Sequence, residues 1–241
     1  SGNFVRYDAA QSLTDEQKAQ ARGNINAAPG GFGLGGGATI LTANDNLDDI
    51  WKAGWYAWDA APQNAPTVGG TPISYCAMYV LNKGGDYNLH QIAYTFEGYE
   101  IHRHYNGGEQ SWSDWEWVNP PMQLGIEYRT TERYRGKPVY VKLIDCGSAP
   151  SNSMKKIDTG LDYMVIDRRL TPTGNMYANS NDNFSIPCES TNVVGENLNI
   201  THGTYVDSGK IRHDAIFVYT TSTTLTGYTV DAVLKYTKTT D

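Results

Sequence analysis

Apolar and polar residues alternate through the last third of the chain. From Tyr228 to Tyr236 every second residue is apolar or aromatic, and most residues between them are polar. A period of two is typical of strands, and shorter runs at residues 139–144 and 215–219 are predicted as further strands. The clean apolar face of the run ending at Tyr236 is typical of an outer strand in an antiparallel sandwich. We therefore expect an antiparallel β-sandwich here.

The middle of the chain has shorter predicted strands bounded by turn residues. They span residues 75–81, 90–96, 99–105 and 113–118. Asn106-Gly107-Gly108 predicts a tight turn between the last two strands. Residues 46–51 predict one capped helical turn, and the sequence Asn-Pro-Pro at residues 119–121 closes the region.

One helix is predicted near the start of the sequence. Thr14 lies three residues before Gln17, as in a capping box, and Gly23 ends a run of strong helix formers. The helix is short and largely polar, so it needs a partner to be stable. The following segment PGGFGLGGG, residues 29–37, contains G-x-G-x-x-G. Because this pattern follows a helix and opens none, it does not predict a dinucleotide site.

Composition agrees with a mainly β fold. The 241 residues include 17 tyrosines and 25 glycines, which favour short strands and tight turns. We expect a helical collar and glycine-rich linker over residues 1–38, a β domain over 39–121 and the β-sandwich head over 122–241.

Charge and cysteine content exclude several classes of function. A net charge of −7 with scattered arginines gives no basic surface for nucleic acid. The sequence has no apolar run of about twenty residues, so no membrane insertion is expected, and its start does not resemble a signal peptide. Cys76, Cys146 and Cys188 are widely spaced. They are expected to be buried reduced thiols and not a disulfide framework or zinc site.

Three segments resemble proteins of bacteriophage tails. YDAAQSLTDEQKAQARGNINAA, residues 7–28, resembles a short helical motif of tail fibres and related tail proteins. The middle region is similar to the knob domain of pyocin and phage tail fibres. GIEYRTTERYRGKPVYVKLIDCGSAPSN, residues 125–152, resembles the opening strands of a β-sandwich head. The residues that carry the knob resemblance are Leu47-Asp48-Asp49-Ile50, Gly54-Trp55-Tyr56, Asn64-Ala65-Pro66, Val80, Gln91, Arg103 and Trp112-Ser113-Asp114-Trp115.

The resemblance implies a homotrimeric virion protein of a tail fibre or tail tip, assembled in the host cytoplasm. Its distal head would attach to a bacterial surface, to a polysaccharide or teichoic acid, and other parts would contact tail or baseplate proteins. Binding without catalysis is the preferred interpretation. A structural tail connector and a polysaccharide depolymerase are the alternatives.

His102 and His104 depart from the knob pattern and raise the question of a metal site. If strand 99–105 alternates, both histidines share one face. In a trimer, six such imidazoles would surround one transition metal on the axis, as in some phage fibre shafts. The favoured interpretation is a hairpin with the histidines on its wet face, because one chain supplies only two ligands. No cofactor is then expected, and Trp112, Trp115 or Trp117 forms the core or, alternatively, a sugar platform.

Catalytic motifs are not found in the sequence. It has no G-x-S-x-G, H-E-x-x-H or phosphate-loop pattern. A pair of glycosidase carboxylates cannot be located from spacing alone, but the long internal repeat of depolymerase β-helices is also missing. Asp45, Asp48 and Asp49 are expected to cap the helical turn, and not to bind calcium. We therefore expect no enzyme.

The receptor site is expected on polar loops of the head, where a rigid sandwich supports exposed side chains. An aromatic ring offers a stacking surface, and amides and carboxylates bind hydroxyl groups. The alternative is that all of these are solvated loop residues. The candidates are Tyr177, Asn179, Asn181, Asp182, Asn183, Arg168, Arg169 and His202.

Overall fold

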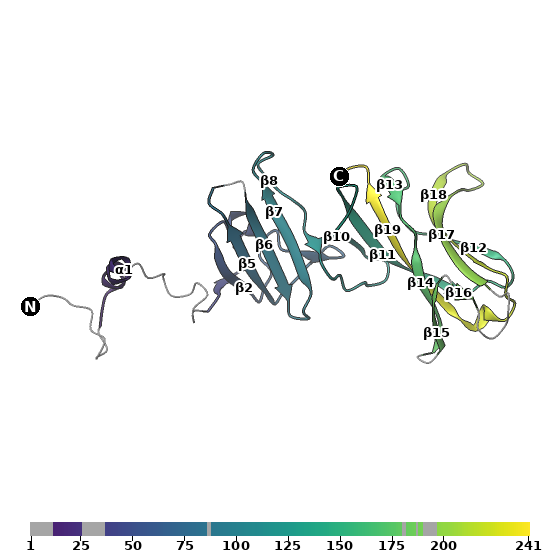
Figure 1. The fold of residues 1–241 in the computed structure, drawn as a ribbon, viewed down its shortest axis with the longest axis horizontal. Coiled ribbons are helices and arrows are strands. Elements are labelled where there is room, and N and C mark those ends of the chain that lie inside the picture. Colours follow the sequence, from purple (N-terminus) through teal and green to yellow (C-terminus); the bar gives the residue numbers. More distant parts are fainter. Residues whose placement is uncertain (1–11, 26–36, 86–87, 180–181, 187, 190–196) are drawn as a thin grey trace, which may run out of the picture. The chain divides into compact units, whose positions relative to one another are not determined.

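The computed structural model describes residues 12–25, 37–85, 88–179, 182–186, 188–189 and 197–241 (Figure 1). The described chain is mainly β, as predicted. It forms two compact units whose segments alternate along the sequence. The first unit comprises the residues up to Ala65 with Ser74–Phe96 and His104–Trp112, and the second comprises Pro66–Ile73, Glu97–Arg103 and Ser113–Asp241. The expected division into residues 1–38, 39–121 and 122–241 stays a prediction.

Helix α1 spans Asp15–Asn24 and begins with the predicted capping box. The Gln17 amide donates to Thr14 Oγ1 at 3.3 Å, and the Thr14 amide donates to Gln17 Oε1 at 3.0 Å. These bonds satisfy amide groups that the first turn leaves without partners. No residue of α1 is buried. Its sequence therefore defines where the helix begins, but its side chains contribute nothing to a hydrophobic core.

The sheet of the first unit runs in the order β1-β2-β5-β6-β7. β1 is parallel to β2, whereas β2, β5 and β6 pair antiparallel. Side chains alternate between a buried inner face and a more exposed outer face in β2, β5 and β6. The strand bounds are β1 (Thr39–Leu41), β2 (Gly54–Trp58), β5 (Cys76–Asn82), β6 (Leu89–Thr95), β7 (Glu100–Asn106) and β8 (Ser111–Trp112).

The inner face of this sheet forms the core of the first unit. Its largest buried side chains include Trp58, Met78 and Leu89. The single helical turn η1 (Leu47–Asp49) begins at Asn46, as predicted, and is held to the sheet by Gln91. The buried Gln91 amide donates to the carbonyl of Leu47 at 2.7 Å and to that of Ile50 at 3.1 Å. The knob-like residues Leu47 and Gln91 thus have a structural use in holding the turn.

The second unit contains two larger sheets and a small ribbon. The first continues the 13-stranded sheet from β7, whose Ile101 and His102 pair with Trp117 and Glu116 of β9, in the order β9-β10-β11-β19-β14-β15, with β13 also paired to β19. Its bounds are β9 (Glu116–Trp117), β10 (Glu127–Tyr134), β11 (Lys137–Ser148), β13 (Ile166–Arg169), β14 (Thr173–Asn179), β15 (Asp182–Ile186) and β19 (Thr229–Lys238). The second has the order β12-β18-β17-β16, with bounds β12 (Met154–Asp158), β16 (Cys188–Glu189), β17 (Asn197–Val206) and β18 (Arg212–Thr220). The ribbon is β3 (Thr67–Val68) with β4 (Thr71–Pro72), and η2 (Leu225–Gly227) precedes β19.

The two larger sheets share one hydrophobic core, as in a β-sandwich. Leu234 and Tyr236 of the first sheet and Ile216 and Val218 of the second are buried in it. The predicted alternation of β19 is confirmed, but its expected position as an outer strand is wrong. β19 lies between β11 and β14. Alternation shows which face of a strand is buried, but it does not determine which strands pair with that strand.

β11 is buried on both faces because it contributes to two cores. Tyr140 and Ile144 join the sandwich core, whereas Val139 and Val141 join a second cluster. That second cluster includes Ile101, Trp117 and Tyr128, with Val68, Ile73 and Tyr99 packed against it. Segments from before residue 121 therefore complete the core of the second unit.

Two cysteine side chains are described, and both Cys76 and Cys146 are buried free thiols, as expected. Burial raises the pKa of Cys146 to about 12, so its reactive thiolate is scarce at neutral pH. None of the helices in the described ranges is long and apolar enough to span a bilayer.

Candidate functional site

The candidate site is the outer face of β11, β19 and β14, which is the face turned away from the sandwich core. Val230 and Ala232 of β19 point into that core, so Asp231 between them projects outward. Asp231 pairs with Asp145 of β11 on one side and with Asn175 of β14 on the other. Directly paired residues share a face. Three polar side chains from three strands therefore meet in one row.

Tyr177 extends this row by hydrogen bonding to Asp231. Tyr177 lies two residues beyond Asn175 on β14, on the same face. Burial and the nearby charge of Asp145 raise the pKa of Asp231, and the hydrogen bond from Tyr177 partly offsets this rise. The charge of Asp231 in turn raises the pKa of the Tyr177 hydroxyl. The hydroxyl stays protonated at neutral pH and donates to the carboxylate.

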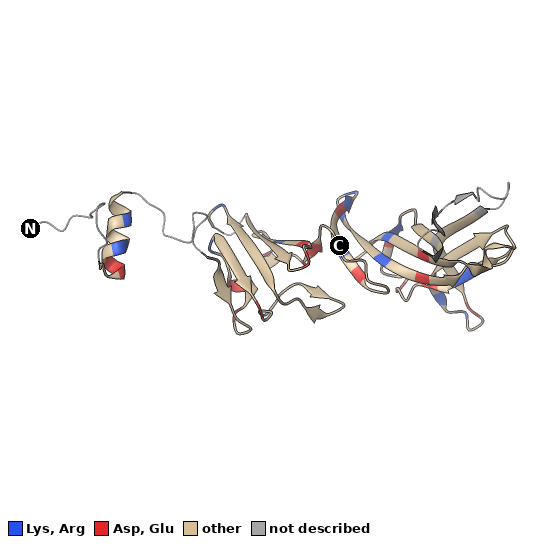
Figure 2. Ribbon diagram, turned by 90° about the horizontal axis from the view of Figure 1, so that it is seen from below, with Lys and Arg blue, Asp and Glu red and all other residues tan. Residues whose placement is uncertain are grey.

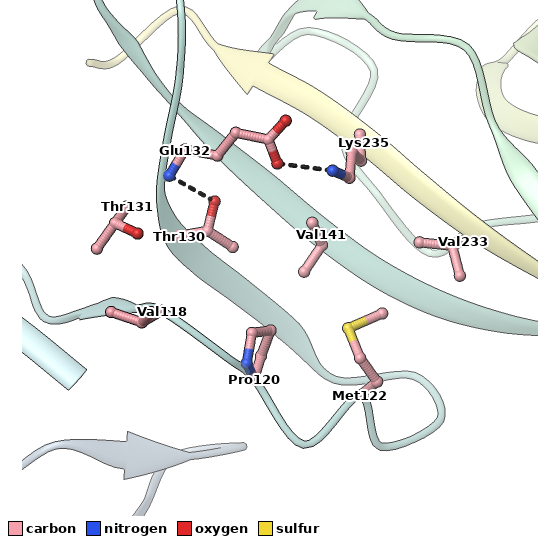
Figure 3. Close-up of a pocket in the computed structure, with 9 residues that line it drawn as sticks. All are labelled: Val118, Pro120, Met122, Thr130, Thr131, Glu132, Val141, Val233 and Lys235. Atoms are coloured by element: carbon pink, nitrogen blue, oxygen red, sulfur yellow. Dashed lines mark hydrogen bonds and ion pairs between the residues drawn. The ribbon is translucent and has the colours of Figure 1, made fainter. Parts of the chain in front are cut away.

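A pocket of about 380 Å³ opens on the same face (Figure 3). Val141 and Val233 form its strand side, and Val118, Pro120 and Met122 lie across from them. The pocket is of a size that takes small ligands and is mainly apolar. Its polar wall is formed by Lys235, whose Nζ lies 2.6 Å from Glu132 Oε2, together with Thr130 and Thr131.

The pocket and the polar row are adjacent parts of one surface. Val233 lines the pocket, and Asp231 lies two residues along the same strand. This spacing separates them by about 7 Å. The apolar wall and the ring of Tyr177 suit the hydrocarbon faces of a sugar, and Asp145, Asp231 and Asn175 suit its hydroxyl groups. We call this combined surface, from Lys235 to Tyr177, the outer-face site.

The residues predicted around Tyr177 belong to a hairpin and not to a loop. Tyr177 pairs with Asn183 across β14 and β15, and Asn179 pairs with Asp182. These four residues are therefore neighbours, although the pairing is through strands. Asn181 lies outside the described residues. The many turn-forming residues of this segment predicted a loop. The segment forms a strand because the pairing of β14 with β19 outweighs the weak intrinsic strand preference of the β14 sequence.

Arg169 and His202 were predicted as exposed ligands, and the structure corrects this. Both lie on strands and bind Asp214, whose side chain is fully buried. Arg169 Nη2 lies 2.6 Å from Asp214 Oδ1, and His202 Nε2 lies 2.7 Å from Asp214 Oδ2. The His202 side chain is only 1% exposed, so a receptor cannot reach it. Arg168 is exposed, but it too lies on a strand, β13.

Thr159 completes the cluster around Asp214. Its Oγ1 donates to Asp214 Oδ2 at 2.6 Å. Burial raises the pKa of Asp214, but hydrogen bonds from His202, Thr159 and Arg169 outweigh burial and hold the pKa below its usual value. His202 Nδ1 is buried and has no hydrogen-bond partner among the described residues, so the ring binds the cluster through Nε2. The cluster joins β13 of one sheet to β17 and β18 of the other.

The two histidines of the proposed metal site have separate neighbours within one chain. Strand β7 alternates as predicted, with Ile101 and Arg103 buried. His102 Nε2 lies 2.6 Å from Glu100 Oε1. The ring of His104 lies near that of His90, with centroids 6.0 Å apart. Within the described ranges no three His, Cys, Asp or Glu side chains are grouped to hold a metal ion. A site shared by three chains stays a prediction.

The tryptophans of the stretch from Ser111 to Trp117 have structural neighbours. Trp117 is buried and packs edge-on against Tyr128, with centroids 5.3 Å apart. Trp112 packs against Tyr105 of the first unit at 5.5 Å. The guanidinium of Arg103 lies 4.6 Å from the ring centroid of Trp115. The expected contribution of Trp117 to a core is confirmed.

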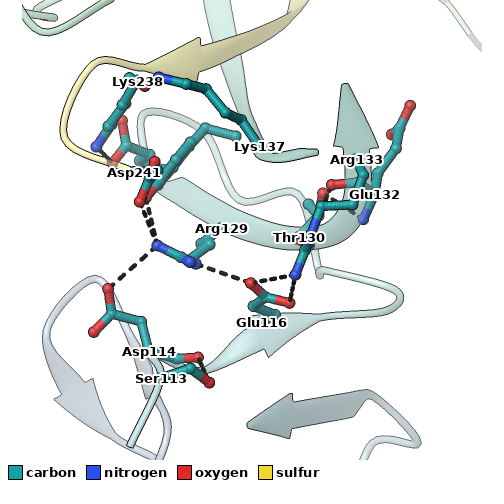
Figure 4. A network of polar contacts seen from close by, with 12 residues as sticks. Ser113, Asp114, Glu116, Arg129, Thr130, Glu132, Arg133, Lys137, Lys238 and Asp241 are labelled. Carbon is teal, nitrogen blue, oxygen red and sulfur yellow. Dashed lines mark hydrogen bonds and ion pairs between the residues drawn. The ribbon is translucent and has the colours of Figure 1, made fainter. Parts of the chain in front are cut away.

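A charged network around Glu116 links β9 and β10 (Figure 4). The Glu116 carboxylate is buried between Arg129, at 3.0 Å, and Arg133, at 2.7 Å. Arg129 also contacts Asp241 at 2.6 Å and Asp114 at 3.5 Å. Each guanidinium has an acidic partner, so the network is best explained as structural. It was not foreseen from sequence because its members lie far apart.

The main residues of the outer-face site that sequence analysis missed are Asp145, Asp231 and the pocket lining. A partial signal existed for Asp231, because the alternation of β19 places it on the polar face. No sequence signal pairs it with Asp145, which lies on β11 and meets it only through strand register.

Comparisons with known proteins show a distant structural similarity. No family model and no curated protein sequence matches the chain. Among solved structures, the chain is similar to a fragment of the R1 pyocin fibre of P. aeruginosa comprising its C-terminal residues 323–701. The match covers 84% of this chain and 69% of the fragment, with 11% sequence identity and a TM-score of 0.26. At this similarity the neighbour assigns neither a family nor a function to the chain.

Proposed function

We propose that this chain is the receptor-binding part of a phage or phage-like tail fibre, and that it binds a bacterial surface glycan without cleaving it. The resemblance of the sequence to tail-fibre segments supports the tail location. The observation that carries glycan binding is the outer-face site, where a pocket and the Tyr177–Asp231 pair share one surface. The residues lie mainly on paired strands, which hold a site more rigidly than loops do.

The charge of the site favours a neutral glycan, or one with amino groups, over teichoic acid. Asp145 and Asp231 are paired directly across two strands, and such a pair repels the phosphates of a teichoic acid. The one lysine of the pocket, Lys235, is already paired with Glu132. Hydroxyl and amino groups, in contrast, donate hydrogen bonds to carboxylates.

Two carboxylates are also the machinery of glycosidases, so binding and cleavage need separate tests. On this proposal Asp145 and Asp231 accept hydrogen bonds and no bond of the glycan is broken. Purified polysaccharide of a bound strain should release no new reducing ends when incubated with the protein. Release that disappears in Asp231→Asn would replace binding by hydrolysis as the function.

The central test is the removal of the Tyr177 ring. Fluorescently labelled full chain is first screened against a panel of bacterial strains, and bound strains are kept. Tyr177→Ala should then weaken binding by about 5- to 150-fold, since loss of a stacking ring and its hydrogen bond removes roughly 1–3 kcal/mol. Tyr219→Ala is the matched control, because Tyr219 is an exposed tyrosine on the other sheet.

Thermal unfolding of both variants separates a lost contact from a lost fold. Equal binding by wild type and Tyr177→Ala would remove the outer-face site from receptor recognition. A loss shared by Tyr177→Ala and Tyr219→Ala would place recognition elsewhere on the head. No binding to any strain would favour a structural connector.

A further inference from the structure

One histidine of the β12-β18-β17-β16 sheet has a carboxylate at each nitrogen of its ring. His213 lies on β18; its Nδ1 lies 3.1 Å from Asp158 Oδ2, and its Nε2 lies 3.0 Å from Asp207 Oδ2. Asp158 is the last residue of β12, whereas Asp207 is the first residue of the turn between β17 and β18. The imidazole therefore connects the end of one strand to the turn between two others.

Each of these carboxylates is oriented by its own turn. Asp158 Oδ1 accepts a hydrogen bond from the Gly160 amide at 2.8 Å, and Asp207 Oδ1 accepts one from the Ile211 amide at 2.8 Å. The Asp207 amide also donates to the Ile211 carbonyl at 2.9 Å. One oxygen of each carboxylate thus holds a turn, and the other faces His213. A change at the imidazole therefore acts on both turns.

Protonation of the ring decides whether both contacts are hydrogen bonds. A carboxylate only accepts, and a neutral imidazole has a single N–H, so it donates to one of the two carboxylates. Its other nitrogen then turns a lone pair toward a carboxylate oxygen, and the two repel. The imidazolium donates from both nitrogens. Histidine is the side chain that ordinarily gains or loses this proton between about pH 5 and pH 8.

Other charged groups near His213 contact aromatic rings. Figure 2 shows basic residues in blue and acidic residues in red interspersed along the strands of the second unit. The Tyr205 ring of β17 stacks on the His213 ring, with centroids 5.1 Å apart. The Nζ of Lys156 on β12 lies 4.1 Å from the centroid of the Tyr205 ring, and the guanidinium of Arg212 lies 5.8 Å from that of Tyr163. The two carboxylates are therefore the charged groups that bind the imidazole directly.

We propose that His213 is a pH-sensitive link: its protonated ring fastens the β17–β18 turn, residues 207–211, to the end of β12, and loss of one proton releases that turn. Val206 and Ile211, at the two ends of the turn, are 51% and 61% exposed. Without the link, the turn is held by the bonds between Asp207 and Ile211. The proposal goes beyond glycan binding, because the outer-face site lies on the other sheet of the sandwich.

The acid limit of the link is set by Asp207. The hydrogen bond from His213 lowers the pKa of Asp207, and the bond from the Ile211 amide acts in the same direction. A carboxylate with a lowered pKa contributes stability above its unfolded value, about 3.9, and this contribution is lost as pH falls through the folded value. The alkaline limit is the loss of the imidazolium proton. The link therefore operates between these two titrations.

The first experiment follows His213 and the turn together through a pH titration. NMR spectra of the isotope-labelled full chain, from about pH 5 to pH 9, report the two ring nitrogens and the exchange of the Ile211 amide. At the acid end both ring nitrogens should carry a proton. As the ring loses one, the protection factor of the Ile211 amide, which corrects for intrinsic exchange at each pH, should fall about fivefold, the effect of losing one hydrogen bond.

Two variants separate the link from general effects of pH. His213→Gln removes the titrating ring, so the Ile211 protection factor should not change over this range. Asp158→Asn is the sharper variant, because its amide oxygen still accepts the bond of its own turn and its amide nitrogen donates to the neutral ring. Protection should then persist above the wild-type midpoint. His90→Gln is the matched control, since His90 lies on β6 and binds Asn88, and it should keep the wild-type response.

Three results would overturn the proposal. A constant Ile211 protection factor while the wild-type ring titrates would mean that the turn is held without His213. A fall of the same size in His213→Gln would assign the pH response to another group. A wild-type response in Asp158→Asn would remove the connection to β12. None of these results bears on glycan binding, which is measured separately with Tyr177→Ala.

Discussion

At the scale of single residues, Asp214 is expected to be among the most sensitive positions of the head. Its buried carboxylate is bound by Arg169, His202 and Thr159. Asp214→Ala leaves a guanidinium and an imidazole without their acceptor and should lower the free energy of unfolding by about 3–5 kcal/mol. Chemical denaturation measures this. Glu132→Ala, which breaks an exposed pair, should cost below about 1 kcal/mol.

The same residue gives the direction of a pH effect. The pKa of Asp214 lies below its usual value, so its bonds stabilise the fold above about pH 4, the unfolded value. This stabilisation is lost as pH falls through the folded-state pKa. An acid limb of the stability curve that is unchanged in Asp214→Ala would contradict this account, as would equal losses in Asp214→Ala and Glu132→Ala.

Residue type alone did not predict which of the candidate residues are buried. Tyr177 is partly exposed beside Asp231, whereas Arg169 and His202 bind the buried carboxylate of Asp214. The difference arises because Asp214, the partner that draws them inward, is separated from Arg169 by 45 positions and from His202 by 12. The burial of a polar side chain can be predicted only when its bonding partner is known, and no local sequence pattern identifies that partner.

At the scale of secondary structure, the sequence predicted correctly those elements whose formation depends mainly on residues close together in the chain. The capping box of α1, the helical turn after Asn46 and the alternation of β19 all lie where the sequence predicts them. The β14–β15 hairpin was expected as a loop, because its Gly and Asn residues favour turns. The segment forms strands because the backbone of β14 pairs with that of β19. This pairing depends on the sheet and not on the sequence of the segment.

A substitution at Gly174 tests whether the stability of β14 depends on its close pairing with β19. A Cβ atom at this position would lie 2.2 Å from the carbonyl oxygen of Asp231. Gly174→Ala must therefore shift β14 away from β19, at an expected cost of about 2–3 kcal/mol in unfolding free energy. Gly227→Ala is the control, because a Cβ there meets nothing within 4 Å.

Displacement of β14 should also move Tyr177 away from Asp231. Glycan binding by Gly174→Ala should fall together with its stability, whereas Gly227→Ala should keep both. Equal melting temperatures of the two glycine variants would mean that β14 adapts without leaving its register.

At the scale of the whole molecule, the number of joined sites should decide attachment to cells. If three chains assemble, as the resemblance to tail fibres implies, the assembly carries three outer-face sites, and binding to a repetitive surface gains about 10²–10⁴-fold in avidity without new contacts. Size-exclusion chromatography with light scattering gives the number of chains, and three times the chain mass of 26.6 kDa is expected. Attachment of the assembly to bacteria should then be at least about a hundredfold tighter than the binding of one site to a soluble oligosaccharide.

Tyr177→Ala should lower the affinity for the soluble oligosaccharide and the attachment to cells together, without changing the number of chains in the assembly. Titration calorimetry with the oligosaccharide and flow cytometry with whole cells measure the two quantities. If whole cells are bound no more tightly than the soluble oligosaccharide, the sites of one assembly do not engage together. Attachment then depends on the strength of one site, and the assembly has another purpose, such as mechanical continuity along the fibre.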